Sequence, residues 1–263
     1  MYTYIEFSSK DRVATISVNR PDFSNALNVD TMSEIADAVR SADADLSVGA
    51  VVITGKGKHF SAGGDIKRFK MLIDTGTYLE AASIAKADEM ASTIRNCSKP
   101  VIAMVNGVAT GAGLSMALAC DFRIVASNSK MSMGFVNMGL PGDTGAIFML
   151  MRLLGPSSAY RLMMLGEMIS GEEAVRLGLA TMVTEDGRLE EETYEFASRL
   201  AAKSAVALAA QKRLINKYFY GDKLETFYKD EQREMVEASH LPDFAEATNA
   251  FLEKRKPEFN KNK

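Results

Sequence analysis

Short apolar runs that alternate with helix-like patterns constrain this chain more than any other feature of its sequence. Four such runs are bounded by polar or glycine-containing stretches, and they cover residues 4–7, 13–18, 50–54 and 101–105. Runs of this length and pattern predict strands. Between the second and third runs, residues 31–40 carry apolar side chains at helical spacing, and Asp30 precedes them as a candidate N-cap. Strands that alternate with helices favour an α/β fold.

The second half of the chain changes to a mostly helical pattern. The predicted helices cover residues 144–154, 157–165, 171–177, 189–218, 227–239 and 243–254. Residues 67–77 are mostly polar and contain Gly76, which predicts a mobile loop. We therefore expect an α/β core over residues 1–195, followed by a helical C-terminal region over residues 196–263.

Composition excludes several classes of protein. The formal net charge of the 263 residues is −3, without the basic face that nucleic-acid binding usually needs. No apolar run approaches the ~20 residues that span a bilayer, and the N-terminal residues lack the pattern of a signal peptide. Cys97 and Cys120 form neither a spaced metal motif nor a disulfide framework. These observations predict a cytoplasmic protein with no metal, no nucleic acid and no membrane among its partners.

Two glycine-containing segments each follow an apolar run. The first contains Ala62-Gly63-Gly64, and the second contains Gly111-Ala112-Gly113 before a helical pattern. Glycine lets a backbone approach a ligand closely, and a helix that opens there presents free N–H groups at its positive end. Two such N–H groups aimed at one oxygen would form an oxyanion hole. Plain structural turns are the alternative. Neither segment has the glycine spacing of a dinucleotide site or a P-loop.

Five stretches in order along the chain give it a family resemblance. They are Asn19-Arg20-Pro21 with Asn25-Ala26-Leu27-Asn28, then residues 60–66, 100–121, 166–174 and 250–257. Together they resemble the enoyl-CoA hydratase/isomerase (crotonase) family, from Ile5 to Phe259. The resemblance implies a spiral of repeated strand–strand–helix turns with a C-terminal region that forms trimers, which many members pair into hexamers. It also implies an acyl-coenzyme A substrate and no separate cofactor.

The same resemblance assigns roles to individual residues. It places the backbone N–H groups of Gly64 and Ala112 on the thioester oxygen, where they stabilise an enolate. The substrate-binding residues that it implies around them are Ala62, Asp65, Ile66, Lys67, Ser115, Phe135, Phe251 and Lys254. Lys67 is expected near the CoA phosphates, and Phe251 with Lys254 would cover CoA, often from a neighbouring subunit. The lysines could instead be ordinary surface residues, and Phe251 could pack the terminal helix.

The acid–base residues depart from the family's hydratase pattern. Hydratases in the family use two glutamates, which would fall at Ser115 and Phe135 in this sequence. Asp143 instead matches a position where isomerases and dehalogenases of the family carry an aspartate. One carboxylate suffices to move a proton between two carbons. The alternative for Asp143 is an N-cap of the helix that begins near Thr144, a role that would lower its pKa.

We therefore expect an enoyl-CoA double-bond isomerase that uses Asp143. One alternative is hydration with an atypical acid such as Glu80 or Glu89. Others are a dehalogenase or hydrolase in which Asp143 attacks the substrate, and a CoA-binding subunit without activity. A Ser-His-Asp hydrolase is disfavoured, because the chain has two histidines, His59 in a predicted loop and His240 in a late turn.

Overall fold

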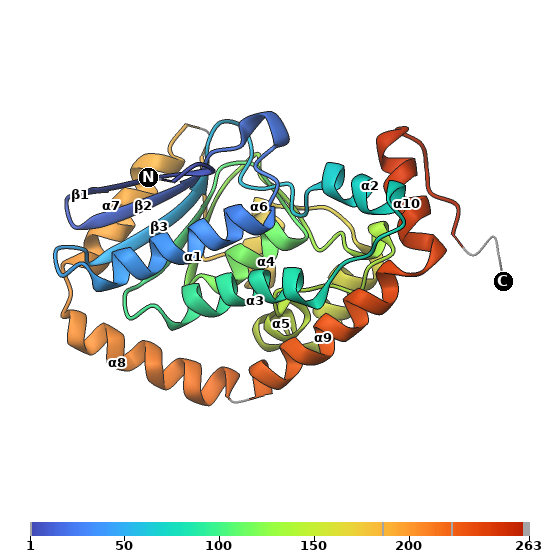
Figure 1. The fold of residues 1–263 in the computed structure, drawn as a ribbon. Coiled ribbons are helices and arrows are strands. Elements are labelled where there is room, and N and C mark those ends of the chain that lie inside the picture. The colour runs from blue at the N-terminus through green and yellow to red at the C-terminus, as the bar shows by residue number, and fades with distance from the viewer. Residues whose placement is uncertain (1, 186, 222, 260–263) are drawn as a thin grey trace.

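The largest element of the fold is a six-stranded sheet with the strand order β1-β2-β3-β4-β6-β9 (Figure 1). The computed structural model describes residues 2–185, 187–221 and 223–259. β1 pairs antiparallel with β2, and the later pairs are parallel. The strands are β1 (Ile5–Lys10), β2 (Val13–Val18), β3 (Ala50–Gly55), β4 (Val101–Val105), β6 (Phe122–Ala126) and β9 (Met182–Thr184). The first four confirm the strands predicted from the sequence.

A second, three-stranded sheet was not predicted. Its strands are only two or three residues long and have the order β5 (Val108–Thr110), β7 (Lys130–Ser132) and β8 (Ile169–Ser170). Such short strands carry no periodic signal of their own. β5 follows β4 after a two-residue turn, so the chain passes from the large sheet directly into the small one.

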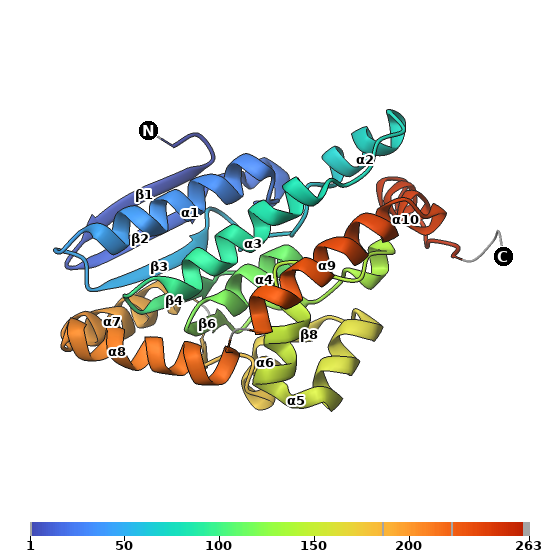
Figure 2. The same ribbon diagram turned by 60° about the horizontal axis from the view of Figure 1, so that its bottom comes forward.

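Helices cover both faces of the large sheet (Figures 1 and 2). They are α1 (Val29–Ala44), α2 (Ile66–Asp74), α3 (Ala81–Asn96), α4 (Ala112–Ala119), α5 (Ala146–Leu165), α6 (Gly171–Leu177), α7 (Leu189–Ala201), α8 (Ala205–Ile215), α9 (Lys223–Ser239) and α10 (Pro242–Leu252). Short 3₁₀ turns are η1 (Pro21–Phe23) and η2 (Val136–Met138), and η3 (Asn216–Tyr220) is a π-helical turn.

The pleat of β3 explains why this sheet has two apolar faces. Val51 and Ile53 belong to the main core with α1 and α3, whereas Ala50 and Val52 belong to a smaller core with α7. Side chains alternate along a strand, so a strand that is covered on both sides is apolar throughout. The α/β class predicted from the sequence is confirmed.

Two local predictions are wrong. α1 begins at Val29, because the Asn28 side chain, rather than that of Asp30, accepts a hydrogen bond from the N–H of Thr31 at 2.8 Å. The segment predicted as a mobile loop is mostly the helix α2, which Asp65 caps by accepting from the N–H of Lys67 at 3.1 Å. α2 buries no residue fully, so its sequence looks polar, yet Phe69 packs partly against the core.

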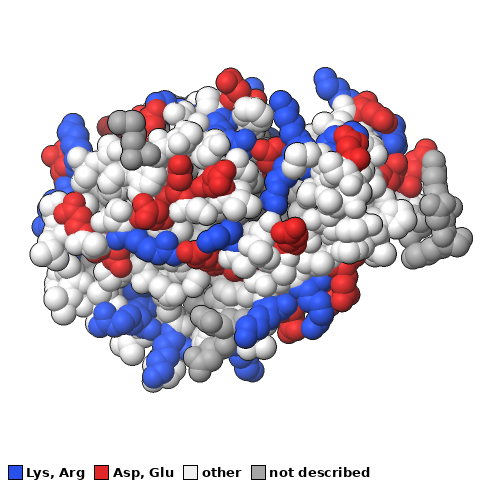
Figure 3. Space-filling view, viewed as in Figure 1, with Lys and Arg blue, Asp and Glu red and all other residues white. Residues whose placement is uncertain are grey.

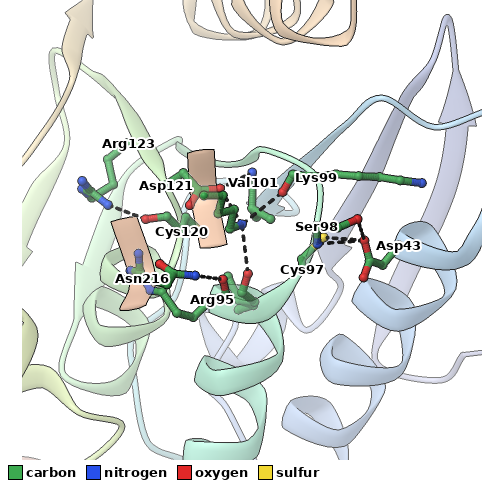
Figure 4. Close-up of polar contacts among 12 residues, drawn as sticks. Asp43, Arg95, Cys97, Ser98, Lys99, Val101, Cys120, Asp121, Arg123 and Asn216 are labelled. Carbon is green, nitrogen blue, oxygen red and sulfur yellow. Dashed lines mark hydrogen bonds and ion pairs between the residues drawn. The ribbon is translucent and has the colours of Figure 1, made fainter. Parts of the chain in front are cut away.

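α8 is fixed to the core by a buried ion pair. Lys212 Nζ lies 2.7 Å from Asp121 and donates to the carbonyl oxygen of Lys99 at 3.0 Å. Just beyond α8, Asn216 donates to the carbonyl oxygen of Arg95 at 2.8 Å, within the polar network shown in Figure 4. The division of the chain after residue 195 stays a prediction, and α7, which crosses it, packs on the large sheet.

Two further observations concern the whole molecule. Acidic and basic side chains interleave on the face seen in Figure 3. Among the described residues, no helix is both long enough and apolar enough to cross a membrane.

Candidate active site

The two glycine-containing segments predicted from the sequence lie side by side. The N–H of Ser61 donates to the carbonyl of Val108 at 2.9 Å, and the N–H of Thr110 donates to the carbonyl of Ser61 at 3.0 Å. The Thr110 hydroxyl also donates to the carbonyl of Ala62 at 2.9 Å. A β-carbon built at Gly113 would lie 2.6 Å from the Ser61 carbonyl oxygen. Only glycine allows so close an approach of the two segments.

Gly64 and Ala112 both lie at the beginnings of helices. Ala112 is the first residue of α4, after Gly111 with a φ of 49°. Gly64 directly precedes Asp65, the N-cap of α2. Within the part of the chain that the structure describes, no backbone or side-chain acceptor takes a hydrogen bond from either N–H. Two such N–H groups at the positive ends of helices can bind an anionic oxygen.

The early motif of the chain frames the first segment. Arg20 donates to Asp65 at 2.8 Å, and both side chains are about nine-tenths buried. Asn25 is fully buried and donates to the carbonyl of His59 at 2.6 Å. Lys67 projects from α2, and its Nζ lies 4.6 Å from the ring centre of Phe23. These contacts hold Ala62–Lys67 in place against residues 20–25.

Ser115 and Phe135 occupy buried positions that cannot supply an acid. The Ser115 hydroxyl donates to the carbonyl of Gly111 at 3.0 Å, within its own helix. The Phe135 ring lies between two glycines: β-carbons built at Gly111 and Gly142 would lie 3.8 and 3.7 Å from it. Phe135 therefore forms an apolar wall between the start of α4 and the loop that carries Asp143.

Asp143 lies in a strained loop before α5. Gly142, Thr144 and Gly145 have φ values of 129°, 63° and 71°, and for a β-branched residue such as Thr144 a positive φ is unusual and costly. Asp143 Oδ1 accepts a hydrogen bond from the Thr144 hydroxyl at 2.7 Å. Part of the Asp143 surface stays accessible, while the surrounding protein raises its pKa to about 6 by desolvation, which the bond from Thr144 partly offsets.

The N-cap alternative for Asp143 is wrong. α5 begins at Ala146 with Gly145 as its N-cap, and no local side chain caps it. The N–H of Gly145 donates instead to Glu231 Oε2 of α9 at 2.7 Å. The Asp143 carboxylate is therefore not occupied by the helix.

Sequence reasoning missed two buried carboxyls beside this loop, Glu231 of α9 and Asp88 of α3. They are 4% and 6% exposed. Each stands on the apolar stripe of its helix: Ile84, Asp88 and Ala91 on α3, and Tyr228, Glu231 and Met235 on α9. A carboxylate at such a stripe position is the signal that could have found them.

The three carboxyls influence one another. Burial, with a smaller contribution from nearby Asp143, raises the pKa of Asp88 to about 7, although the hydrogen bond from Gln232 opposes the shift. Burial raises the pKa of Glu231 well above its usual range, with Asp143 and Asp88 contributing.

Among the described residues, no group of three His, Cys, Asp or Glu side chains is arranged to hold a metal ion.

The other predicted residues are more peripheral. Phe251 is 60% exposed near the end of α10, and Lys254 is exposed just beyond it. Glu89 pairs with Lys86 and Arg40 on the surface, and their hydrogen bonds lower its pKa, so it is a poor proton donor. Glu80 is exposed at the start of α3.

A cavity of about 460 Å³ borders the Asp143 loop between η2, α9 and α10. It is lined by Val136, Gly139, Leu140, Pro141, Glu234, Glu237, Ala238, Leu241, Asp243 and Phe259.

Comparisons with known proteins agree with this architecture. The sequence profile of the enoyl-CoA hydratase/isomerase family matches residues 8–262. A crotonyl-CoA hydratase from Syntrophomonas wolfei is 36% identical over 267 residues, covering 98% of each chain. A trans-2-decenoyl-[acyl-carrier-protein] isomerase from Streptococcus mutans is 31% identical, covering 97% of each. The structure of an enoyl-CoA hydratase from Mycobacterium avium subsp. paratuberculosis superposes with a TM-score of 0.89 at 30% identity, covering 99% of this chain and 100% of that one.

The chain belongs to the enoyl-CoA hydratase/isomerase family and has the crotonase fold. It is therefore an enzyme that processes acyl-CoA substrates.

Proposed function

We propose that this enzyme moves the double bond of a 3-enoyl-CoA into conjugation with the thioester. The observation that carries the proposal is the position of Asp143, a partly accessible carboxylate with a raised pKa and no helix-capping duty. The free N–H groups of Gly64 and Ala112 support it as an oxyanion hole. Ser115 and Phe135 stand where hydratases of the family carry glutamates, which argues against ordinary hydration.

The reaction needs one base that becomes an acid. The Asp143 carboxylate removes a proton from C2, and the electrons of that C–H bond form a dienolate whose charge lies on the thioester oxygen. The N–H groups of Gly64 and Ala112 stabilise this charge, each by about 3–4 kcal/mol. Asp143 then returns its proton to C4, which leaves a double bond between C2 and C3. No cofactor beyond the CoA of the substrate enters this mechanism.

Hydration is the second candidate, because two of the three relatives above are named as hydratases. It would need a further acid near Asp143. Burial raises the pKa values of Glu231 and Asp88, so these carboxyls are better candidates for that acid than Glu80 or Glu89.

The test follows the ultraviolet absorbance of the conjugated enoyl thioester with 3-enoyl-CoA and 2-enoyl-CoA supplied separately. We expect a rise from the 3-enoyl substrate and a loss of about 100- to 10,000-fold in kcat for Asp143→Asn. An Asp143→Asn enzyme with full activity would refute the role of Asp143. A fall from the 2-enoyl substrate, without a rise from the other, would favour hydration.

We also propose that the chain assembles as a trimer or a dimer of trimers. Large apolar side chains on α5, α8 and η3 are exposed in the single chain: Tyr160, Met164, Leu165, Val206, Leu214, Ile215 and Tyr218. Exposed apolar surface of this kind is typical of subunit interfaces. Phe251 and Lys254 would then help cover the CoA of a neighbouring subunit. Light scattering of the purified protein should give three or six times the chain mass of 28.6 kDa, and a monomer would contradict the proposal.

A further inference from the structure

The start of α5 depends on a side chain from a distant helix. The first N–H groups of a helix have no partners inside it, and they need acceptors when they are buried. Gly145 and Ala146 are buried, and no local side chain caps them. Glu231 of α9, 86 residues away, accepts a hydrogen bond from the N–H of Gly145 at 2.7 Å. Glu231 therefore caps the start of α5 from a different helix of the same chain.

Asp88 lies beside the same loop on a third helix. It accepts a hydrogen bond from the Gln232 side chain at 2.5 Å, and the Asp143 charge raises its pKa. Thr144 has a positive φ, which is costly for a β-branched residue, so the loop conformation requires support from its surroundings. Glu231 binds the loop backbone on the C-terminal side of Asp143, and the Asp143 carboxylate keeps its bond to the Thr144 hydroxyl.

We propose that Glu231 is a positioning residue for Asp143. It caps α5 from α9 and so leaves the Asp143 carboxylate free for proton transfer. This inference rests on the proposed function, in which Asp143 moves the proton. Without Glu231, the N–H of Gly145 would lose its acceptor, and Asp143, two residues earlier in the chain, is a carboxylate that could cap α5 instead. A capped Asp143 would have a lower pKa and would be a weaker base.

The charge state of Glu231 indicates which substitution should preserve the cap. Four ionisable side chains lie near the loop: Asp143 itself, Asp88 on α3, and Glu231 and Tyr228 on α9. Tyr228 is close to the loop backbone, since a β-carbon built at Gly145 would lie 2.7 Å from its ring. Burial and the neighbouring carboxyls raise the pKa of Glu231, which favours its neutral form. A neutral carboxyl caps through its carbonyl oxygen, and a glutamine side chain has the same oxygen at the same reach.

The experiment measures kcat, KM and the pH profile of kcat/KM for 3-enoyl-CoA isomerisation in three variants. For Glu231→Ala we expect kcat to fall about 10- to 100-fold with KM nearly unchanged, and the acid limb to move about one pH unit lower. Glu231→Gln should restore kcat to within about threefold and leave the acid limb in place. Asp230→Ala, an exposed neighbour on α9, is the matched control and should behave like the wild type.

Two outcomes would overturn the inference. One is a Glu231→Ala enzyme with wild-type kcat and an unshifted acid limb. The other is a folded Glu231→Gln enzyme whose kcat falls more than tenfold or whose pH profile of kcat/KM shifts. If the alanine variant does not fold, the glutamine variant alone tests the inference. The Asp143→Asn variant distinguishes a failure of the positioning role from a failure of the proposed function. If Asp143→Asn is inactive while Glu231→Ala is normal, only the positioning role of Glu231 is refuted. If Asp143→Asn is active, the proposed function itself is refuted.

Discussion

The hydroxyl of Thr144 donates a hydrogen bond to Oδ1 of Asp143 at 2.7 Å, and this bond lowers the pKa of a carboxyl otherwise raised by burial. Replacing Thr144 by valine removes the donor while keeping the shape of the side chain. We expect the pKa of Asp143 to rise above about 6. Because the base must be ionised, the acid limb of kcat/KM should move to higher pH.

The pH profile of isomerisation measures this shift directly. Thr144→Ser keeps the hydroxyl and serves as the control, with its acid limb expected at the wild-type position. A valine variant whose acid limb stays in place, or moves to lower pH, would show that Thr144 does not tune Asp143.

The contact between Gly113 and Ser61 predicts a defect in the oxyanion hole. A β-carbon at Gly113 would lie 2.6 Å from the Ser61 carbonyl oxygen, a backbone atom that cannot move without separating the two segments. Gly113→Ala should therefore displace the neighbouring N–H of Ala112 and lower kcat about 100-fold. Gly134→Ala, whose β-carbon would lie 3.4 Å from the Ser132 hydroxyl, should cost little activity. Equal rates for the two variants would contradict the prediction.

The raised pKa of Asp88 makes folding stability depend on pH. Its pKa is about 7 in the folded protein against 3.8 for an ordinary aspartate, so folding opposes its ionisation. The resulting cost is absent below about pH 4, grows as the pH rises, and is complete above about pH 7. Asp88→Asn should therefore increase the free energy of unfolding by about 1–3 kcal/mol at pH 8 and by almost nothing near pH 4.

Urea denaturation at the two pH values tests this expectation. Asp74→Asn, at an exposed ion pair, is the control and should show no such trend. A gain from Asp88→Asn that is the same at both pH values would mean that charge is not its cause.

The Lys212–Asp121 pair predicts a large loss of stability on truncation. Both side chains are at least four-fifths buried, and Asp121 also accepts from the N–H of Val101 at 2.8 Å (Figure 4). Lys212→Met leaves Asp121 without its counter-ion, which typically costs about 3–5 kcal/mol. The midpoint of thermal unfolding should fall clearly, whereas Lys203→Met at an exposed position should leave it nearly unchanged. Similar unfolding midpoints for the two variants would show that the Lys212–Asp121 ion pair does not stabilise the fold.

Much of the fold could be predicted from the sequence, because the long strands and helices have clear periods. The strand over 101–105 and the helix over 171–177 coincide with β4 and α6. The strands of the small sheet could not be predicted, since two or three residues pair there only through tertiary contacts. α2 was missed because it is stabilised by the Asp65 cap and by partial packing of Phe69, without an apolar stripe of fully buried residues.

The candidate site was predictable in its motifs but not in its surroundings. Gly64, Ala112 and Asp143 were found because each lies in a recognisable segment. Their roles stay predictions until they are tested. Glu231 and Asp88 belong to no motif. They come near Asp143 because α3 packs on α9 and Glu231 of α9 bonds to Gly145 just before α5, and such a meeting of three distant segments has no signature in the sequence alone.

The packing of α2 against α10 links one N–H group of the candidate site to a distant part of the chain. A β-carbon at Gly64 would lie 2.7 Å from the Phe69 ring, and that ring meets Phe244 of α10 with 5.3 Å between their centres. The N–H of Gly64, which we propose as an oxyanion donor, is therefore held in place through α10, although α10 contributes no strand to the large sheet. Loosening α10 would disturb the proposed oxyanion hole without unpairing any strand of that sheet.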